Sequence, residues 1–217
     1  MEPDRLAAMR ASYQLAGLDV ADLAPDPIRQ LADWLSTAVT AELAEPNAMI
    51  LATADGSGRP SARTVLLKGY GAAGLLFFTN HTSRKARELA ANPWATVVFP
   101  WYPIGRQVIA SGPVARIDDA ESAAYFASRP YDSQIGAWAS RQSTVVPSRA
   151  ELDERYRRLV QRWPAGGPVP APDFWGGYRL APDTVEFWQG RVGRMHDRLR
   201  YRRSADGTEW IIERLAP

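Results

Sequence analysis

Cysteine is absent from the 217 residues, and histidine occurs only twice, at His81 and His196. The first absence excludes disulfides, thiolate nucleophiles and cysteine-based metal sites, and it is consistent with a reducing cytoplasm. Two histidines that lie far apart in the sequence argue against a histidine-rich metal site. We therefore expect a cytoplasmic protein without a bound metal.

Long apolar segments are also missing. No window of the sequence approaches the ~20 apolar residues of a membrane-spanning helix. Residues 1–13 carry charges and lack the apolar core of a signal peptide. Lys and Arg number 26 against 24 Asp and Glu, and the resulting net charge of +2 is too small to attract nucleic acid in bulk. We predict neither a membrane protein nor a nucleic-acid-binding protein.

Two common catalytic signatures are not found. The sequence has no Walker-type phosphate loop and no Gly-x-Ser-x-Gly elbow. A Ser-His-Asp hydrolase stays open on residue counts alone, but nothing local supports it. If the protein is an enzyme, we expect a bound cofactor to carry the difficult chemical step.

The composition that is present is typical of a soluble globular protein. Hydrophobic residues make up 46% and charged residues 23% of the chain. Eight Trp and eight Tyr suit planar ligands, although cores and interfaces also use them. We predict an N-terminal arm over residues 1–24 and a single domain over residues 25–217.

Hydrophobic periodicity predicts many short strands and few long helices. A helix is expected after Asp26-Pro27, where apolar residues recur at helical spacing and Pro46 follows. Further helices are expected over residues 83–91, from Asp118 to 128–130, and over 152–163. Strands are expected over residues 48–54, 62–68, 75–79, 95–101, 106–117, 177–180, 184–189, 195–203 and 209–215. This order predicts a mainly β fold with added helices (α+β), built on an antiparallel sheet or barrel.

The segment near the C-terminus groups three cationic side chains. If residues 194–198 form a strand, Arg194, His196 and Arg198 point to the same face. Such a cluster is costly unless an anion neutralises it. The alternative is a solvated strand face with scattered charge.

Other cations and hydroxyls suit phosphate binding. Arg63 and Lys68 flank an apolar strand, where their odd spacing directs them to opposite faces. Ser83-Arg84-Lys85 stands at an expected helix start, where backbone N–H groups and two cations would favour phosphate. Taken alone, Arg84 and Lys85 are ordinary surface charges.

A second group lies in the middle of the chain. Tyr125 and Arg129 are four residues apart on an expected helix and would share a face, with Ser133 following. A phenol, a guanidinium and a hydroxyl could grip a phosphate monoester, but a core Tyr and a solvated Arg explain them as well. Trp175 and Trp188 could wall a flat ligand or belong to the core.

Taken together, these segments resemble the pyridoxamine/pyridoxine 5'-phosphate oxidase family, the FMN enzymes that make pyridoxal 5'-phosphate. The similarity runs from about residue 48 to residue 217. The matching motifs are Arg63-Thr64-Val65-Leu66-Leu67-Lys68, Phe78-Thr79-Asn80 with Ser83-Arg84-Lys85, Arg106-Gln107-Val108, Ser128-Arg129-Pro130, Ser133-Gln134-Ile135-Gly136-Ala137-Trp138, Gln142-Ser143, Trp175-Gly176-Gly177-Tyr178, Glu186-Phe187-Trp188-Gln189-Gly190, Arg194-Met195-His196-Asp197-Arg198 and Arg214-Leu215-Ala216-Pro217.

The resemblance implies an FMN-binding split β-barrel and a homodimer with FMN at the subunit interface. It implies FMN contacts from Arg63, Thr64, Val65, Leu66, Leu67, Lys68, Phe78, Thr79, Arg84, Lys85, Gln107, Gln142, Ser143, Trp188 and Arg198. It implies that Lys68, Tyr125, Arg129 and Ser133 hold the substrate phosphate. Arg194 and His196 would be the catalytic residues at the substrate ring. Arg10 and Tyr13 lie where the family has a substrate-covering segment, although that segment's usual second Arg is Ala11 here.

The implied reaction is oxidation of pyridoxine or pyridoxamine 5'-phosphate by hydride transfer to FMN. Oxygen would then reoxidise the flavin and give hydrogen peroxide, with ammonia released from the amine. Arg194 would act electrostatically, and His196 is a candidate proton acceptor. Three alternatives stay open: a flavin oxidase of the same fold acting on another flat substrate, as in phenazine assembly; a non-catalytic carrier of flavin or pyridoxal phosphate; and a purely structural domain.

Overall fold

The computed structural model describes residues 16–217, and these residues divide into two compact units. Unit 1 contains the described residues up to Pro46, together with Val98–Ala110 and Asp183–Pro217. Unit 2 contains Asn47–Val97 and Ser111–Pro182. Strands β5 (Trp94–Trp101) and β6 (Arg106–Arg116) contribute residues to both units. No helix among residues 16–217 is long and apolar enough to cross a membrane. The prediction of a single domain over residues 25–217 stays a prediction.

Unit 1 is a helix packed on antiparallel strands. Its strands are β8 (Thr184–Gln189), β9 (Asp197–Arg203) and β10 (Trp210–Arg214), which follow β5 and β6 in the order β5-β6-β8-β9-β10. The pairs β8–β9 and β9–β10 are antiparallel. Helix α2 (Pro27–Thr40) begins as predicted, because the Asp26 side chain accepts the backbone N–H groups of Ile28 and Arg29. Short 3₁₀ helices are η1 (Val20–Asp22), η2 (Tyr102–Ile104) and η3 (Val192–Arg194).

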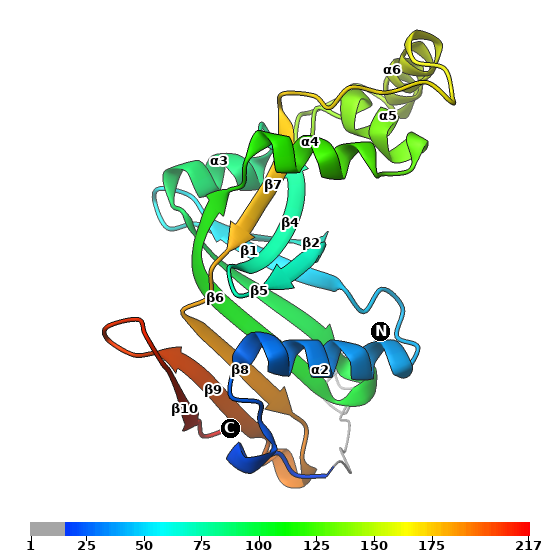
Figure 1. The fold of residues 1–217 in the computed structure, drawn as a ribbon. Coiled ribbons are helices and arrows are strands. Elements are labelled where there is room, and N and C mark those ends of the chain that lie inside the picture. Colours follow the sequence, from blue (N-terminus) through cyan, green and yellow to red (C-terminus); the bar gives the residue numbers. More distant parts are fainter. Residues whose placement is uncertain (1–15) are drawn as a thin grey trace, which may run out of the picture. The chain divides into compact units, whose positions relative to one another are not determined.

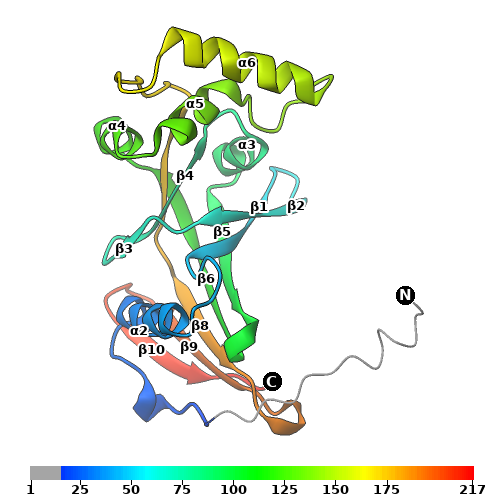
Figure 2. The same ribbon diagram turned by 90° about the vertical axis from the view of Figure 1, so that its right-hand side faces the viewer.

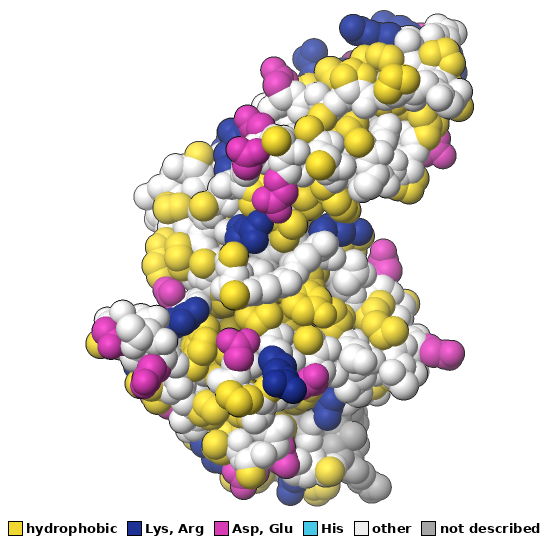
Figure 3. All heavy atoms as spheres, viewed as in Figure 1, with side chains coloured by type: hydrophobic (Ala, Val, Ile, Leu, Met, Phe, Trp, Pro, Cys, Tyr) yellow, Lys and Arg dark blue, Asp and Glu magenta, His cyan; other side chains and the backbone are white. Residues whose placement is uncertain are grey.

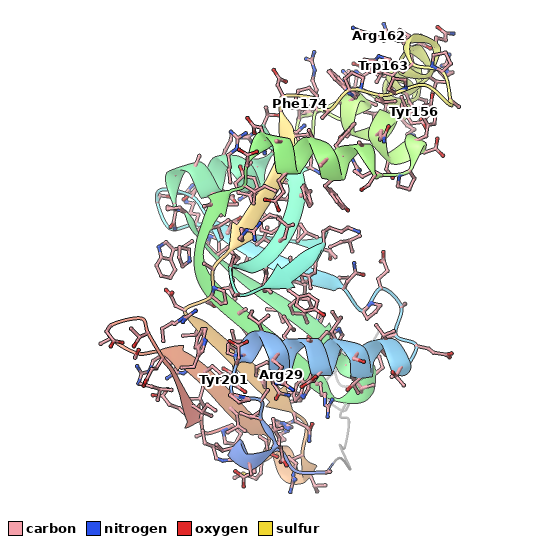
Figure 4. All side chains as sticks on the ribbon, viewed as in Figure 1. Arg29, Tyr156, Arg162, Trp163, Phe174 and Tyr201 are labelled. Carbon is pink, nitrogen blue, oxygen red and sulfur yellow. The ribbon has the colours of Figure 1, made fainter. Side chains whose placement is uncertain are left out.

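Aromatic side chains form the core of unit 1. The rings of Trp34 on α2 and Phe187 on β8 meet edge to face, with centroids 5.1 Å apart. Tyr201, labelled in Figure 4, is fully buried, and its hydroxyl donates to the carbonyl of Ala24 at 2.6 Å. This partly buried hydrogen bond holds the segment that leads into α2.

Unit 2 contains two groups of antiparallel strands. In the first, β1 (Ala48–Ala54) pairs with β2 (Pro60–Leu66) and also neighbours β5. In the second, β4 (Gly74–Asn80) pairs with β3 (Gly69–Gly71) and with β7 (Trp175–Leu180), and β7 pairs in turn with β6. The prediction of a mainly antiparallel β fold with added helices is confirmed.

Three of the four helices described in unit 2 begin at side-chain caps. The four helices are α3 (Arg84–Ala91), α4 (Asp119–Ala127), α5 (Tyr131–Ala139) and α6 (Arg149–Arg162). Ser83, Asp118 and Ser148 accept backbone N–H groups at the starts of α3, α4 and α6, as the sequence predicts. Helix α3 packs against β1, α4 against β7, and α5 against α6 (Figures 1 and 2).

Helix α5 was not predicted. It begins directly after Pro130 without a side-chain cap, and its apolar residues do not form a clear stripe. Ile135 of α5 is fully buried with Phe126 and Val169, and Trp163 packs against this cluster (Figure 4). Tertiary packing therefore stabilises a helix that its own sequence marks poorly.

The spacing Gly69-x-Gly71-x-x-Gly74 matches the pattern of dinucleotide-binding turns, but it has another role here. Those turns join a strand to a helix, whereas these glycines lie in the hairpin between β3 and β4, where Gly71 pairs with Gly74. Gly74 has φ +118°, and a Cβ there would lie 2.0 Å from the carbonyl oxygen of Leu180. The glycine is required by backbone geometry, not by a nucleotide.

Candidate active site

One pocket lies entirely within unit 2 and has a volume of about 430 Å³. That volume is in the range of small-molecule sites. The pocket contains eight of the residues predicted to bind FMN: Thr64, Val65, Leu66, Lys68, Phe78, Thr79, Lys85 and Gln142. It also contains the whole group predicted to hold the substrate phosphate, namely Lys68, Tyr125, Arg129 and Ser133. Residues far apart in the sequence thus line one cavity.

The remaining predicted residues lie elsewhere. Arg63, Leu67, Arg84 and Ser143 belong to unit 2 but do not line this pocket. Gln107, Trp188, Arg194, His196 and Arg198 belong to unit 1. Arg10 and Tyr13, as well as Ala11, lie outside the described residues. The roles given to all these residues stay predictions.

Arg129 places a partly buried positive charge in the pocket wall. Its guanidinium carbon lies 4.7 Å from the ring centroid of Trp175 and 5.6 Å from that of Phe126. Its Nη1 atom is buried and has no hydrogen-bond partner among residues 16–217. Burial lowers the pKa of Arg129 from its usual value, although the nearby Tyr125 opposes this. A buried donor without a partner is costly, so this atom is suited to an anionic ligand.

Three aromatic rings form the wall beside Arg129. Phe78 stacks on Tyr125 with centroids 3.9 Å apart and on Trp175 with centroids 5.2 Å apart. The sequence leaves Trp175 open as a core residue or a ligand wall. In the structure it lines the pocket together with Asn80, Gly136, Ala137 and Ser140. All of these residues except Ser140 lie within the family motifs quoted from the sequence. The rings exclude water from one side of the cavity.

The helix shared by Tyr125 and Arg129 was predicted too long. Helix α4 ends at Ala127, and Ser128 caps it with its backbone N–H bonded to the carbonyls of Tyr125 and Phe126. Arg129 therefore lies in the turn before α5, and Ser133 lies on the first turn of α5. Pro130 disfavours helical geometry at the preceding residue, which explains why α4 stops. The three side chains nevertheless line the same pocket.

Lys85 provides a second cation. Its Nζ donates to Thr79 Oγ1 at 3.1 Å and to Gln142 Oε1 at 2.7 Å. Burial, together with the charge of Arg63, lowers the pKa of Lys85 to about 8, although Glu88 opposes the shift. An anion would restore the charged form. The predicted start of α3 places this lysine correctly, one residue after the first residue of the helix.

Arg63 and Lys68 have different surroundings, but the prediction of opposite faces assumed that both residues lie on one strand. Strand β2 ends at Leu66, two residues earlier than predicted, so Lys68 lies just beyond it. The Lys68 backbone N–H donates to the carbonyl of Leu76 at 2.8 Å, and Lys68 lines the pocket. Arg63 instead bonds to Leu51, Thr53, Ser61 and Glu88.

The predicted strand through residues 194–198 is wrong. Arg194 ends the 3₁₀ helix η3, and β9 begins only at Asp197. Gly193 and Arg194 adopt left-handed backbone angles, with φ of 67° and 63°, which lie outside the β region of regular strands. Arg194, His196 and Arg198 therefore do not alternate along one strand face.

The cluster around His196 belongs to unit 1. The His196 ring lies 4.6 Å from that of Trp188, and its Nδ1 accepts the backbone N–H of Arg191 at 3.1 Å. Trp188 pairs with Arg198 across β8 and β9, and Arg198 makes a two-pronged ion pair with Glu186 at 2.7 and 3.0 Å. The Glu186 hydrogen bonds raise the pKa of Arg198. Because Nδ1 accepts, the proton of the neutral imidazole lies on Nε2.

Charges on the molecular surface are mixed. Figure 3 shows Lys and Arg side chains interspersed with Asp and Glu on the face drawn. This pattern agrees with the small net charge and gives no broad basic surface on that face.

Two sequence profiles match the chain. One, described as "Pyridoxamine 5'-phosphate oxidase", matches residues 35–161. The other, described as "Pyridoxine 5'-phosphate oxidase C-terminal dimerisation region", matches residues 175–217. The second match supports the formation of a homodimer.

Curated proteins and solved structures agree with these profiles. The chain is 58% identical over 201 residues to a pyridoxine/pyridoxamine 5'-phosphate oxidase of Salinispora arenicola, covering 93% of this chain and 90% of the relative. It is 54% identical over 215 residues to the protein of that name from Streptomyces avermitilis, covering 97% and 96%. Its fold matches PhzG from Burkholderia lata 383, solved with tetrahydrophenazine-1-carboxylic acid, with a TM-score of 0.88 and 33% identity over 95% of this chain and 100% of that one. The predicted split β-barrel class is thereby confirmed.

Proposed function

The chain belongs to the pyridoxamine 5'-phosphate oxidase family, and on that premise we propose that it oxidises pyridoxine and pyridoxamine 5'-phosphate to pyridoxal 5'-phosphate. The proposal includes FMN as cofactor and a homodimer with FMN at the subunit interface. The observation that carries the substrate assignment is the unpartnered Nη1 of Arg129, in a pocket also lined by Lys68, Tyr125 and Ser133. A phosphate monoester satisfies that donor set.

The pocket fits a phosphorylated flavin as well. Lys85 is a buried cation beside Thr79 and Gln142, and the charge of an anion would offset its lowered pKa. The β2 residues Thr64 to Leu66 also line the cavity. FMN would be held by the residues that line the pocket in unit 2, joined by Gln107, Trp188 and Arg198 across the proposed subunit interface. Bound FMN supplies the redox chemistry, acceptance of a hydride from substrate C4' and reduction of O₂ to hydrogen peroxide.

The chain's own residues orient the substrate and tune its charge. Arg129 binds the phosphate with help from the Tyr125 and Ser133 hydroxyls, and Phe78 and Trp175 keep water away from one wall. Arg194 places a positive charge at the substrate ring. His196 donates from Nε2 to a ring oxygen and so favours the ionised substrate, because its Nδ1 already accepts the Arg191 N–H. We therefore assign His196 a hydrogen-bond donor role instead of the proton-acceptor role considered from the sequence.

The overall reaction balances as follows. The alcohol substrate and O₂ give the aldehyde and hydrogen peroxide. The amine substrate, O₂ and water give the aldehyde, ammonia and hydrogen peroxide.

A second candidate is oxidation of another flat substrate, because the fold also matches PhzG. The complete phosphate-binding group in the pocket favours the vitamin B6 phosphates over an unphosphorylated ring. An anaerobic titration of FMN-loaded protein with pyridoxine 5'-phosphate tests the assignment through the visible absorbance of the flavin. Bleaching that reverses when air is admitted is the expected result. A flavin spectrum that shifts without bleaching would contradict the oxidase assignment for this substrate.

A further inference from the structure

Glu88 is a buried carboxylate outside the predicted site, and it joins two arginines. Its side chain is 5% exposed. Its Oε2 accepts from Thr53 Oγ1 at 2.5 Å, from Ser61 Oγ at 2.6 Å and from Arg63 Nη2 at 3.3 Å. Its Oε1 accepts from Arg84 Nε at 2.8 Å. Each carboxylate oxygen thus has a distinct set of donors.

The three side chains that donate to Oε2 lie on two paired strands. Thr53 on β1 pairs directly with Ser61 on β2, and Arg63 lies two residues further along β2 on the same face. Arg63 also donates to Leu51 O at 3.2 Å, to Thr53 Oγ1 at 2.5 Å and to the Ser61 hydroxyl. Both terminal nitrogens of Arg63 therefore bond within the protein, and this arginine helps to hold the Glu88 carboxylate in place.

Arg84 has the opposite character. Its side chain is 58% exposed, and only Nε is bonded to Glu88. Among residues 16–217, no hydrogen bond engages its two terminal nitrogens. The next residue, Lys85, lines the pocket. An Nε anchor fixes the plane of the guanidinium and leaves both Nη groups available for an anion.

We propose that Glu88 is a positioning residue that holds Arg84 for the phosphate of FMN. The proposal rests on the proposed FMN binding. Arg63, Arg84 and Lys85 contribute three positive charges, and Glu88 removes one. The remaining charge of about +2 matches a phosphate monoester, which carries about −1.5 to −2 at neutral pH. Glu88 therefore orders the arginines without over-neutralising the cluster.

The substitution Glu88→Gln separates the two oxygens chemically. A glutamine has one acceptor oxygen and one NH₂ group that only donates. Three donors converge on the Oε2 position, so the glutamine oxygen is expected to remain there. The NH₂ group then faces the Arg84 Nε–H, and two donors oppose each other. Arg84 loses its anchor while Arg63 keeps its own.

The test compares FMN with riboflavin, which lacks the phosphate. Apoprotein is titrated with each flavin, and the quenching of flavin fluorescence gives both dissociation constants. Glu88→Gln should weaken FMN binding about tenfold, the scale of one charge-assisted hydrogen bond. Riboflavin binding should stay within about twofold, because no phosphate contact is involved. Glu121→Gln is a matched control, since Glu121 pairs with Arg179 at 2.9 Å outside the pocket.

Arg84→Lys gives an independent variant at an exposed position that is compatible with folding. Lysine keeps the charge but cannot bond Glu88 with one nitrogen and the phosphate with two others. Arg84→Lys should also weaken FMN binding about tenfold and leave riboflavin binding nearly unchanged. The double variant should bind FMN no more weakly than the weaker-binding of the two single variants, because both changes remove the same contact.

Three outcomes would overturn the proposal. Equal losses for FMN and riboflavin would mean a purely structural role. Unchanged or tighter FMN binding in Glu88→Gln would mean that removing the negative charge outweighs any loss of order in the Arg84 side chain. Unchanged FMN binding in Arg84→Lys would show that Arg84 makes no directed contact with the FMN phosphate. These assays contain no vitamin B6 substrate, so they test flavin binding alone. If FMN binds normally but pyridoxine 5'-phosphate does not bleach the flavin, only the oxidase function is refuted. Failure of the unmodified protein to bind FMN would overturn both proposals.

Discussion

Replacing Arg129 by Met tests the phosphate-binding role directly. Arg129 has a buried Nη1 without a partner among the described residues, and its guanidinium lies over Trp175 and Phe126. Methionine is unbranched and makes favourable contacts with aromatic rings. The change therefore removes the charge and the hydrogen-bond donors while it keeps much of the packing.

The structure sets the expected magnitudes. A hydrogen bond between charged groups contributes about 1.5–3 kcal/mol, which corresponds to a roughly 10- to 150-fold weaker affinity for pyridoxine 5'-phosphate. The free energy of unfolding should change by less than about 1 kcal/mol or increase. Loss of the cation–π contacts costs about 0.5–2 kcal/mol, and removal of an unsatisfied buried donor offsets this by about 1–3 kcal/mol.

Affinity is measured by titrating the FMN-loaded protein without oxygen, using pyridoxine 5'-phosphate and unphosphorylated pyridoxine. Stability is measured by urea unfolding. Arg149→Met is the control, because the Arg149 side chain is 84% exposed and its ion pair among residues 16–217 is with Asp153 on the same helix. An equal loss of affinity for both ligands would refute the phosphate role. A drop in stability of more than about 3 kcal/mol would refute the stated balance of contacts.

Two further predictions concern the pH dependence and the packing of the same pocket. The pKa of Lys85 is lowered to about 8, so the free protein loses this charge as pH rises through 8, and FMN affinity should fall above pH 8. Lys85→Met should bind FMN more weakly at pH 7, and its FMN affinity should change little with pH. If the FMN affinity of this variant still falls above pH 8, another group is responsible. A Cβ at position 177 would lie 2.4 Å from Ile117 Cδ1 and 3.0 Å from Phe78 Cε1, so Gly177→Ala should lower the free energy of unfolding by about 1–3 kcal/mol and weaken FMN binding by displacing Phe78. Calorimetry with a flavin titration checks the second prediction, and an unshifted Tm would contradict it.

Local signals in the sequence predicted most elements well. Asp26-Pro27, Ser83, Asp118 and Ser148 mark helix starts because each cap bonds to backbone only two or three residues away. Short runs rich in apolar residues located β1, β5 and β8 within one residue of their observed bounds. The errors lie where local preference is weak or overridden. Helix α5 depends on packing around Ile135. The left-handed Gly193-Arg194 turn precedes β9, which begins at Asp197, two residues later than expected.

The sequence by itself determined the family, the mainly antiparallel class and the residue types that suit phosphate, because these follow from ordered motifs and short-range periodicity. Only the tertiary structure decided how those residues are used. It brought Tyr125, Arg129 and Ser133 into one pocket with β2, left Arg129 Nη1 without a partner among the described residues, and bonded Arg63 internally through Glu88. The Glu88 bonds to β1 and β2 connect residues 25 to 35 positions apart. No periodic pattern encodes such contacts, because they depend on how α3 packs on β1 and on the register of the β1–β2 pair.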